Sequence, residues 1–212
     1  LNSLYNDEKM DAVEKAIVSQ YSENKFFGKP CGLMDQMASS VGGFVSIDFN
    51  DVAKPIIEKV NFDFASVGHS LCIVDTGGCH ADLTDDYAGI PTEMKQVAAF
   101  FGKDVLRNVD EKEFYNNIAK LREKVSDRGI LRAIHFFDDN RRAIELKDAL
   151  KSKDFDRFKK IITQSGFSSS TLLQNVFSSS NPDEQGLSLA LAITAKILDG
   201  KGAYRVHGGG FA

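Results

Sequence analysis

A block of helical periodicity fills the second half of the sequence, and short strand-like segments lie on both sides of it. Between residues 91 and 198 apolar side chains recur at helical spacing. Segments 43–49 and 70–76 precede this block and segment 203–212 follows it, and each has the pattern of a strand. A few strands at both ends of a helical block predict an α+β fold and exclude a doubly wound sheet.

Helices are expected wherever apolar residues line up on one helical face. They span residues 11–21, 32–40, 94–101, 114–125, 134–150, 155–162 and 182–198. The run Leu71–Val74 is apolar throughout, which is typical of a buried strand. We place the best division of the chain near residue 65, which gives domains at 1–65 and 66–212.

The composition is that of a soluble globular protein and excludes several classes of partner. Of the 212 residues, 42% are hydrophobic and 26% are charged, and the net charge is −4. An acidic chain without a basic run offers no surface to nucleic acid or to an anionic membrane. No apolar stretch reaches the roughly 18 residues of a membrane-spanning helix. We expect a cytoplasmic protein, and the sequence carries no signal for an oligomeric state.

The cysteines predict neither a disulfide framework nor a metal site. Cys31, Cys72 and Cys79 are odd in number and include no Cys-x-x-Cys pair. Cys79 lies beside His80, but metal ligands are usually two or more positions apart. We therefore expect reduced thiols and no bound metal.

The strongest chemical signal is the segment Gly28-Lys-Pro-Cys-Gly-Leu-Met-Asp-Gln-Met37. Gly28, Pro30 and Gly32 predict a tight turn whose backbone can approach a ligand closely. Asp35 follows at the front of a helix, where a carboxylate can stabilise the helix dipole or act as a general base. From the spacing alone the structural role is the more common one.

This segment resembles the Pro-Cys-Gly-x-Met-Asp-Gln motif of the galactokinases, which belong to the GHMP kinase superfamily. Two further segments agree in the same order. Residues 75–87 are similar to the family's Asn-x-x-x-x-His-x-Leu-x-x-x-x-Tyr region, and residues 205–212 to its Arg-x-x-Gly-Gly-Gly-Phe-Gly motif. His135 stands where the family often has His-x-x-x-Glu-x-x-Arg. The resemblance covers essentially the whole chain.

The resemblance implies the GHMP kinase architecture, two α+β lobes with the active site between them. Residues 1–65 would form the end of the N-terminal lobe, and residues 66–212 most of a ferredoxin-like C-terminal lobe that is truncated at its end. The family's N-terminal sugar motif and its ATP phosphate loop have no counterpart in this sequence. We therefore expect a fragment that binds no cofactor and is inactive alone.

The resemblance also implies roles for individual residues. Asp35 would be the catalytic base and would contact the sugar, and Gly32 would let the backbone approach the sugar hydroxyls. Tyr87 would offer its phenol to a sugar hydroxyl, although an ordinary half-buried tyrosine is the alternative. Gly208, Gly209 and Gly210 would shape the active site near the phosphates, although three glycines can also form a mere flexible turn.

The implied reaction of the full-length enzyme is ATP- and Mg²⁺-dependent phosphorylation of galactose at its anomeric C1 hydroxyl. Two alternatives remain. One is an anomeric kinase for N-acetylgalactosamine or L-arabinose, because residues 165–170 (Ser-Gly-Phe-Ser-Ser-Ser) depart from the family's Ser-His-x-Ser-Leu pattern. The other is a catalytically silent sensor of sugar and nucleotide that regulates a partner protein.

The serine run Gly166–Ser170 also resembles the superfamily's Gly-Leu-Ser-Ser-Ser-Ala phosphate loop. Such a loop presents backbone N–H groups and a helix N-terminus to phosphates. It precedes the Met-Asp-Gln motif in the superfamily, however, whereas this run follows it. We interpret the run as a polar loop ahead of a helix that begins near Thr171.

Overall fold

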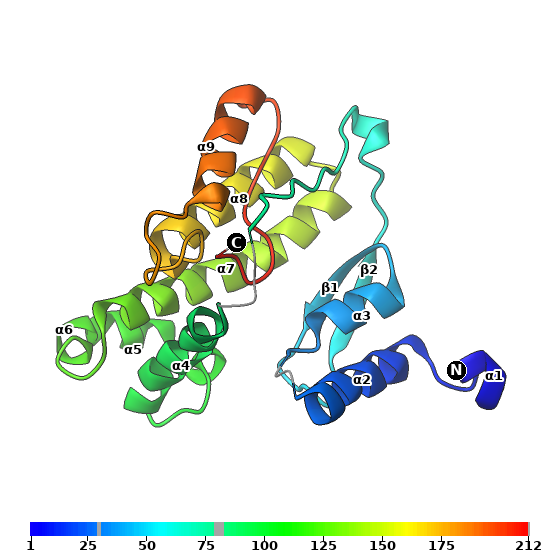
Figure 1. Ribbon diagram of the computed structural model, residues 1–212, viewed down its shortest axis with the longest axis horizontal. Helices are drawn as coiled ribbons and strands as arrows, with labels where there is room; N and C mark the ends of the chain where they lie inside the picture. Colours follow the sequence, from blue (N-terminus) through cyan, green and yellow to red (C-terminus); the bar gives the residue numbers. More distant parts are fainter. Residues whose placement is uncertain (29–30, 79–82, 212) are drawn as a thin grey trace. The chain divides into compact units, whose positions relative to one another are not determined.

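The computed structural model describes residues 1–28, 31–78 and 83–211 and divides into two compact units, Leu1–Phe62 and Asp63–Ala212 (Figure 1). Each unit has a hydrophobic cluster of its own. Helices combine with a two-stranded sheet, so the predicted α+β class is confirmed. In the part of the chain that the structure describes, no helix is long and apolar enough to cross a membrane.

The first unit packs helices beside a hairpin. Its elements are α1 (Asn2–Tyr5), α2 (Ala12–Ser22), the π-helical turn η1 (Glu23–Phe27), α3 (Met34–Val41), β1 (Phe44–Asp48) and β2 (Ile56–Val60). The strands pair antiparallel, with Phe44 opposite Val60. Helix α2 begins at a capping box, because the Asp11 carboxylate accepts from the Glu14 amide and the Glu14 carboxylate accepts from the Asp11 amide.

The core of the first unit joins α2 to α3. Ala16 from α2 packs against Leu33 and Met37, and the sheet adds Ile47 and Ile57. The helices predicted at 11–21 and 32–40 and the strand predicted at 43–49 are thereby confirmed. This small core fixes α3 and so determines which of its side chains reach the surface.

The second unit is helical in its described residues. Its elements are η2 (Ala65–Val67), α4 (Thr84–Phe100), η3 (Leu106–Asn108), α5 (Glu111–Asn116), α6 (Ile118–Leu121), α7 (Asp127–Lys151), α8 (Phe155–Ser168), the π-helical turn η4 (Ser169–Leu173) and α9 (Gly186–Leu198). The long helix α7 crosses the unit and packs against both α4 and α8 (Figure 1). Val97, Phe114, Leu121, Ala133 and Phe137 form the centre of its core.

Two predicted strands are wrong for the described residues. Segment 70–76 has no regular secondary structure and is not part of a sheet, and Leu71, Ile73 and Val74 are 73%, 95% and 63% exposed. Segment 203–211 is likewise outside any sheet, and Ala212 lies outside the described residues. A strand exists only when its backbone pairs with a neighbour, and neither segment pairs with a described one.

The predicted loop at Gly166–Ser170 is also wrong. Helix α8 continues through Ser168, and η4 follows without a break. The side chains of Ser165, Ser168 and Ser169 are buried, so these hydroxyls lie inside the unit.

Helix α4 begins earlier than the sequence predicted. It starts at Thr84, well ahead of the helix predicted at 94–101, and has Pro91 in its interior.

Candidate active site

Asp35 lies at the start of α3 and faces solvent. Leu33 and Met37, on either side of it in the sequence, are 5% and 0% exposed and anchor the helix to the core. Residues four apart share one helical face, so Asp35 between them points away from that face. Its side chain lines an open hollow of about 390 Å³. The other lining residues are all polar or charged: Lys15, Ser19, Glu23, Gln36, Ser39 and Ser40.

Polar side chains hold the segment that leads into α3. The Cys31 amide donates to Asn24 Oδ1 at 2.9 Å, and Gln20 Nε2 donates to the Cys31 carbonyl at 3.1 Å. Within α3, Gln36 Nε2 approaches Cys31 Sγ at 3.5 Å, and Ser40 Oγ donates to a backbone carbonyl of α2 at 2.7 Å. These contacts connect Cys31 and α3 to α2 and η1 and so orient the helix start that carries Asp35.

Gly32 is exposed, and a Cβ at this position would meet only open space. Packing therefore does not require glycine here, and the backbone is open to an approaching molecule. Gly28, at the end of η1, has φ +68°, a conformation that favours glycine. Residues 29 and 30 lie outside the described part of the chain.

In the second unit the structure brings together residues that the sequence singled out separately. The Tyr87 hydroxyl of α4 donates to the Gly210 carbonyl at 2.7 Å. The Tyr87 ring meets the Phe211 ring edge to face, with centroids 5.4 Å apart. We refer to Gly208–Gly210 as the glycine turn. Burial, followed by the charge of Asp86, raises the pKa of the Tyr87 phenol, so the hydroxyl keeps its proton.

Asn175 supports the glycine turn from the other side, and sequence reasoning missed it. The residue is 1% exposed, its Nδ2 donates to the Gly209 carbonyl at 3.1 Å, and its carbonyl accepts from the Phe211 amide at 2.7 Å. A Cβ on Gly210 would overlap that carbonyl oxygen. Asn175 Oδ1 is buried and has no partner among the described residues. A single asparagine outside the motifs carried no sequence signal.

A buried ion-pair cluster fixes the end of η4, just before Asn175. Arg132 of α7 is 2% exposed, and its guanidinium donates to Glu93 Oε2 at 2.9 Å and to the Leu173 carbonyl at 3.1 Å. Arg128 binds the same Glu93 carboxylate, at 2.6 and 3.0 Å. Burial lowers the pKa of Arg132, and Glu93 opposes that shift. The cluster thereby links α4, α7 and the chain that carries Asn175.

The segment ahead of the glycine turn packs directly against the backbone of α8. A Cβ at Gly166 would lie 2.9 Å from both Arg205 Cβ and the Tyr204 carbonyl oxygen. Distances this short are not compatible with a side chain, so residue 166 must be glycine for this packing to exist. The departure from the Ser-His-x-Ser-Leu pattern noted in the sequence is therefore part of how this segment docks.

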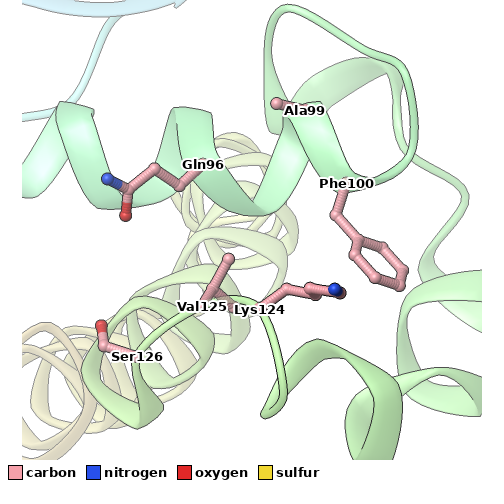
Figure 2. A pocket seen from close by; sticks show the side chains of 6 residues that line it. All are labelled: Gln96, Ala99, Phe100, Lys124, Val125 and Ser126. Carbon is pink, nitrogen blue, oxygen red and sulfur yellow. The ribbon is translucent and has the colours of Figure 1, made fainter.

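A second open hollow, of about 560 Å³, lies between the end of α4 and the turn before α7. Figure 2 shows its lining, with Phe100 and Lys124 at one end and Gln96 and Ser126 at the other. It holds no carboxylate or imidazole, and Ser126 Oγ already accepts from the Gly129 amide at 3.0 Å as the cap of α7. Among its lining residues Lys124 is the charged one.

No three His, Cys, Asp or Glu side chains gather into a metal site within residues 1–28, 31–78 and 83–211. The Cys79–His80 pair considered from the sequence lies outside these residues. His135 lies inside α7, where its Nδ1 is 2.8 Å from Ser168 Oγ. Of the residues predicted for the site, Asp35 and Gly32 lie in the first unit, and Tyr87 and the glycine turn lie in the second.

Comparison with known proteins gives a consistent result. No family model matches the chain. The galactokinase of Actinobacillus pleuropneumoniae serotype 5b is 29% identical over 206 residues, which cover 97% of this chain and 50% of that protein. The galactokinase of Pyrococcus furiosus is 30% identical over 169 residues, covering 77% of this chain and 43% of that protein.

The fold agrees with these sequence matches. A crystal structure of Lactococcus lactis galactokinase complexed with galactose superposes with a TM-score of 0.66 at 18% identity, over 100% of this chain and 52% of that one. The chain thus spans about half the length of the relatives it matches. By sequence and by fold, it is a homologue of the galactokinases that corresponds to about half of their length.

Proposed function

We propose that this chain is part of an ATP-dependent kinase that phosphorylates galactose at its anomeric C1 hydroxyl. The observation that carries the proposal is the exposed carboxylate of Asp35, which lines a polar hollow in a chain matched along 97% of its length by a galactokinase. The lining residues are all polar or charged, which suits a sugar, whose hydroxyls need hydrogen-bond partners.

Asp35 is proposed to act as the general base. Its carboxylate accepts the proton of the C1 hydroxyl while the sugar oxygen forms a bond to the γ-phosphorus of ATP, and the bond between that phosphorus and the ADP oxygen breaks. Phosphoryl transfer depends chiefly on alignment and on charge stabilisation. A rigid helix start held by the Leu33 and Met37 anchors supplies alignment for the base.

Nucleotide and Mg²⁺ are assigned to the part of the relatives' length that this chain does not span. The described residues contain no carboxylate cluster that fits a metal ion, and the serine run at 166–170 is helical instead of forming a phosphate loop. The purified 212-residue chain is accordingly expected to show no ATP-dependent phosphorylation of galactose.

Galactose is favoured over other aldoses because the matched relatives are galactokinases. A kinase for another sugar, such as N-acetylgalactosamine or L-arabinose, is the alternative, since Gly166 replaces the histidine of the family pattern. A second alternative is a sensor that binds sugar without turnover, and the retained Asp35 favours a catalytic protein over such a sensor.

The test is a panel of free sugars with ATP and Mg²⁺, assayed with the full-length protein. Galactose should be the best acceptor, and Asp35→Asn should lower kcat by about a hundredfold or more because general-base catalysis is lost. Asp7→Asn, another exposed carboxylate of the same unit, is the matched control and should keep full activity. Sugar binding without turnover would support the sensor, and near-normal turnover by Asp35→Asn would remove Asp35 from the mechanism.

A further inference from the structure

We propose that Asp139 and Arg205, joined through the Ser165 hydroxyl, are positioning residues that fix the glycine turn. Their geometry is independent of the reaction, and only their catalytic importance rests on the proposed function. Among the described residues, little backbone hydrogen bonding holds the segment 203–210 in place.

Segment 203–210 follows α9 as an irregular chain. Among the described residues it forms no backbone ladder, and the backbone hydrogen bond that reaches this part of the chain is the one from the Phe211 amide to Asn175. A segment without a ladder must be held by burial and by side chains. Val206 and Phe211, at 4% and 6% exposure, provide the burial at its two ends.

Arg205 supplies a network of side-chain bonds at the front of this segment. One terminal nitrogen donates to Ser165 Oγ at 2.6 Å, and Nε donates to the carbonyl of Val206 at 2.8 Å. The other terminal nitrogen lies 3.5 Å from Ser169 Oγ. The guanidinium therefore connects the end of α8 to the backbone two residues before the glycine turn.

Asp139 of α7 completes this connection. The Ser165 hydroxyl accepts from Arg205 and gives its own hydrogen to Asp139 Oδ1 at 2.6 Å, so both bonds form together. Asp139 Oδ2 lies 3.9 Å from the Arg205 guanidinium. Arg142 shares this carboxylate at 3.1 Å but has a second partner in Asp138 at 3.6 Å.

The charge balance makes Asp139 essential to Arg205. Burial lowers the pKa of Arg205, so its cation depends on a nearby anion, and Asp139 is the carboxylate that faces it. Gly166 lets the segment come close enough for these bonds, since any side chain there would collide with Arg205. Loss of Asp139 or of the Ser165 hydroxyl should therefore loosen the glycine turn without disturbing the apolar core.

Hydrogen exchange at the Phe211 amide reads out this role in the chain as it stands. This amide bonds Asn175 at the far end of the glycine turn and does not touch Asp139 or Ser165. Asp139→Asn and Ser165→Ala should each speed its exchange by about tenfold, because a charge-assisted bond to the segment is lost. Peptides of the α4–α7 core should exchange at unchanged rates.

Two further variants sharpen the test. Asp127 lies on the same helix as Asp139, and its exposed carboxylate pairs with Arg122. Asp127→Asn is therefore the control and should leave the exchange of the Phe211 amide unchanged. Arg205→Lys keeps the charge, but a lysine cannot bond Ser165 and Val206 at once. The exchange of the Phe211 amide should therefore be faster in this variant than in the parent. Unchanged Phe211 exchange in Ser165→Ala and in Arg205→Lys would overturn the proposal, even if Asp139→Asn failed to fold.

Activity measurements separate this proposal from the proposed function. In the full-length protein, Ser165→Ala should lower kcat more than it changes the KM for the sugar, because the resemblance to the galactokinases implies a place for the turn near the phosphates, from which it would be displaced. If no variant or parent phosphorylates sugar while Phe211 exchange still responds, the kinase assignment fails and the positioning role stands. If activity is normal in Ser165→Ala despite fast exchange, the glycine turn has no part in turnover, and the catalytic importance of Asp139 and Arg205 is overturned while their role in fixing the turn stands.

Discussion

The ring of Tyr87 occupies the space that a side chain at Gly209 would need. A Cβ on Gly209 would overlap Tyr87 Cε1 and lie 2.7 Å from Cδ1. Gly208, by contrast, has φ +73° and open space around its missing Cβ. The two neighbouring glycines are therefore required for different reasons, Gly209 by contact and Gly208 by backbone conformation.

This difference predicts how alanine substitutions should behave. Gly209→Ala should destabilise the protein by about 1–3 kcal/mol through overpacking against Tyr87. Gly208→Ala should cost about 1–2 kcal/mol, from the left-handed conformation alone. In a Tyr87→Ala background the cost of Gly209→Ala should largely disappear, whereas that of Gly208→Ala should persist. Urea unfolding of the single and double variants measures these costs, and an unchanged Gly209→Ala cost in that background would contradict the contact.

The hydroxyl of Tyr87 should contribute separately from its ring. Tyr87→Phe keeps the ring contact with Phe211 but removes the bond to Gly210, and should lower the free energy of unfolding by about 0.5–1.5 kcal/mol. Tyr115→Phe is the control, since Tyr115 is 42% exposed and its variant should change stability by less than about 0.5 kcal/mol. Equal effects of the two variants in denaturant titrations would argue against the Gly210 bond.

The buried cluster around Arg132 should be the most sensitive ion pair of the described chain. Glu93→Gln leaves the guanidinium of Arg132, which is 2% exposed, without its anion and should cost about 3–5 kcal/mol. Asp127→Asn breaks the exposed pair with Arg122, which solvent screens, and should change stability far less than Glu93→Gln does. Thermal unfolding of both variants at one pH decides the point, and a mild effect of Glu93→Gln would mean that Arg132 finds other partners.

His135 should make stability depend on pH near neutrality. Burial, the largest influence, lowers the pKa of its imidazole, and Asp139 opposes that shift while Arg205 and Arg142 reinforce it. Below the ordinary histidine pKa of about 6.5, the unfolded chain takes up a proton that the folded chain resists. The free energy of unfolding should therefore fall as the pH drops from about 6.5, until the folded-state pKa is passed.

The variant His135→Gln separates the contribution of the His135 imidazole to the pH dependence of stability from that of the carboxylates, which titrate at lower pH. His135→Gln has no imidazole, so its stability should change less than that of the parent between about pH 7 and pH 5.5. His69→Gln removes an imidazole elsewhere in the same unit and is the control for the substitution itself; the His69 ring nitrogens lie 2.8 Å from the Val67 carbonyl and 3.1 Å from the Lys201 carbonyl. Parallel stability curves for the parent and His135→Gln would contradict a lowered pKa at this site.

The helices could be predicted from the sequence because their apolar spacing is a local property. The helix start at Asp35 was among these predictions, whereas the anchoring of that helix by Leu33 and Met37 is a finding of the structure. The catalytic role of Asp35 came from the resemblance and stays a prediction, as do the sugar contacts of Gly32 and Tyr87.

The errors at the predicted strand 70–76 and at the predicted loop 166–170 involve partners distant in the sequence. The apolar run Leu71–Val74 signals burial, yet a strand needs a paired neighbour that no local pattern reveals. The serine run was interpreted as a loop because serines favour loops, but Ser165 and Ser168 are satisfied inside the helix by Asp139 and His135. Tyr87 and Gly210 were each singled out, but their contact spans 123 residues of sequence.

The close approach of segment 203–206 to α8 ties two distant positions of the chain together. With a histidine at position 166, as in the family pattern, this packing cannot form, because even a Cβ would lie 2.9 Å from Tyr204 and Arg205. Relatives with glycine at this position are therefore expected to share the docking seen here, and those with histidine to carry the segment farther out. The identity of residue 166 would then indicate, from sequence alone, whether a relative packs this segment against α8.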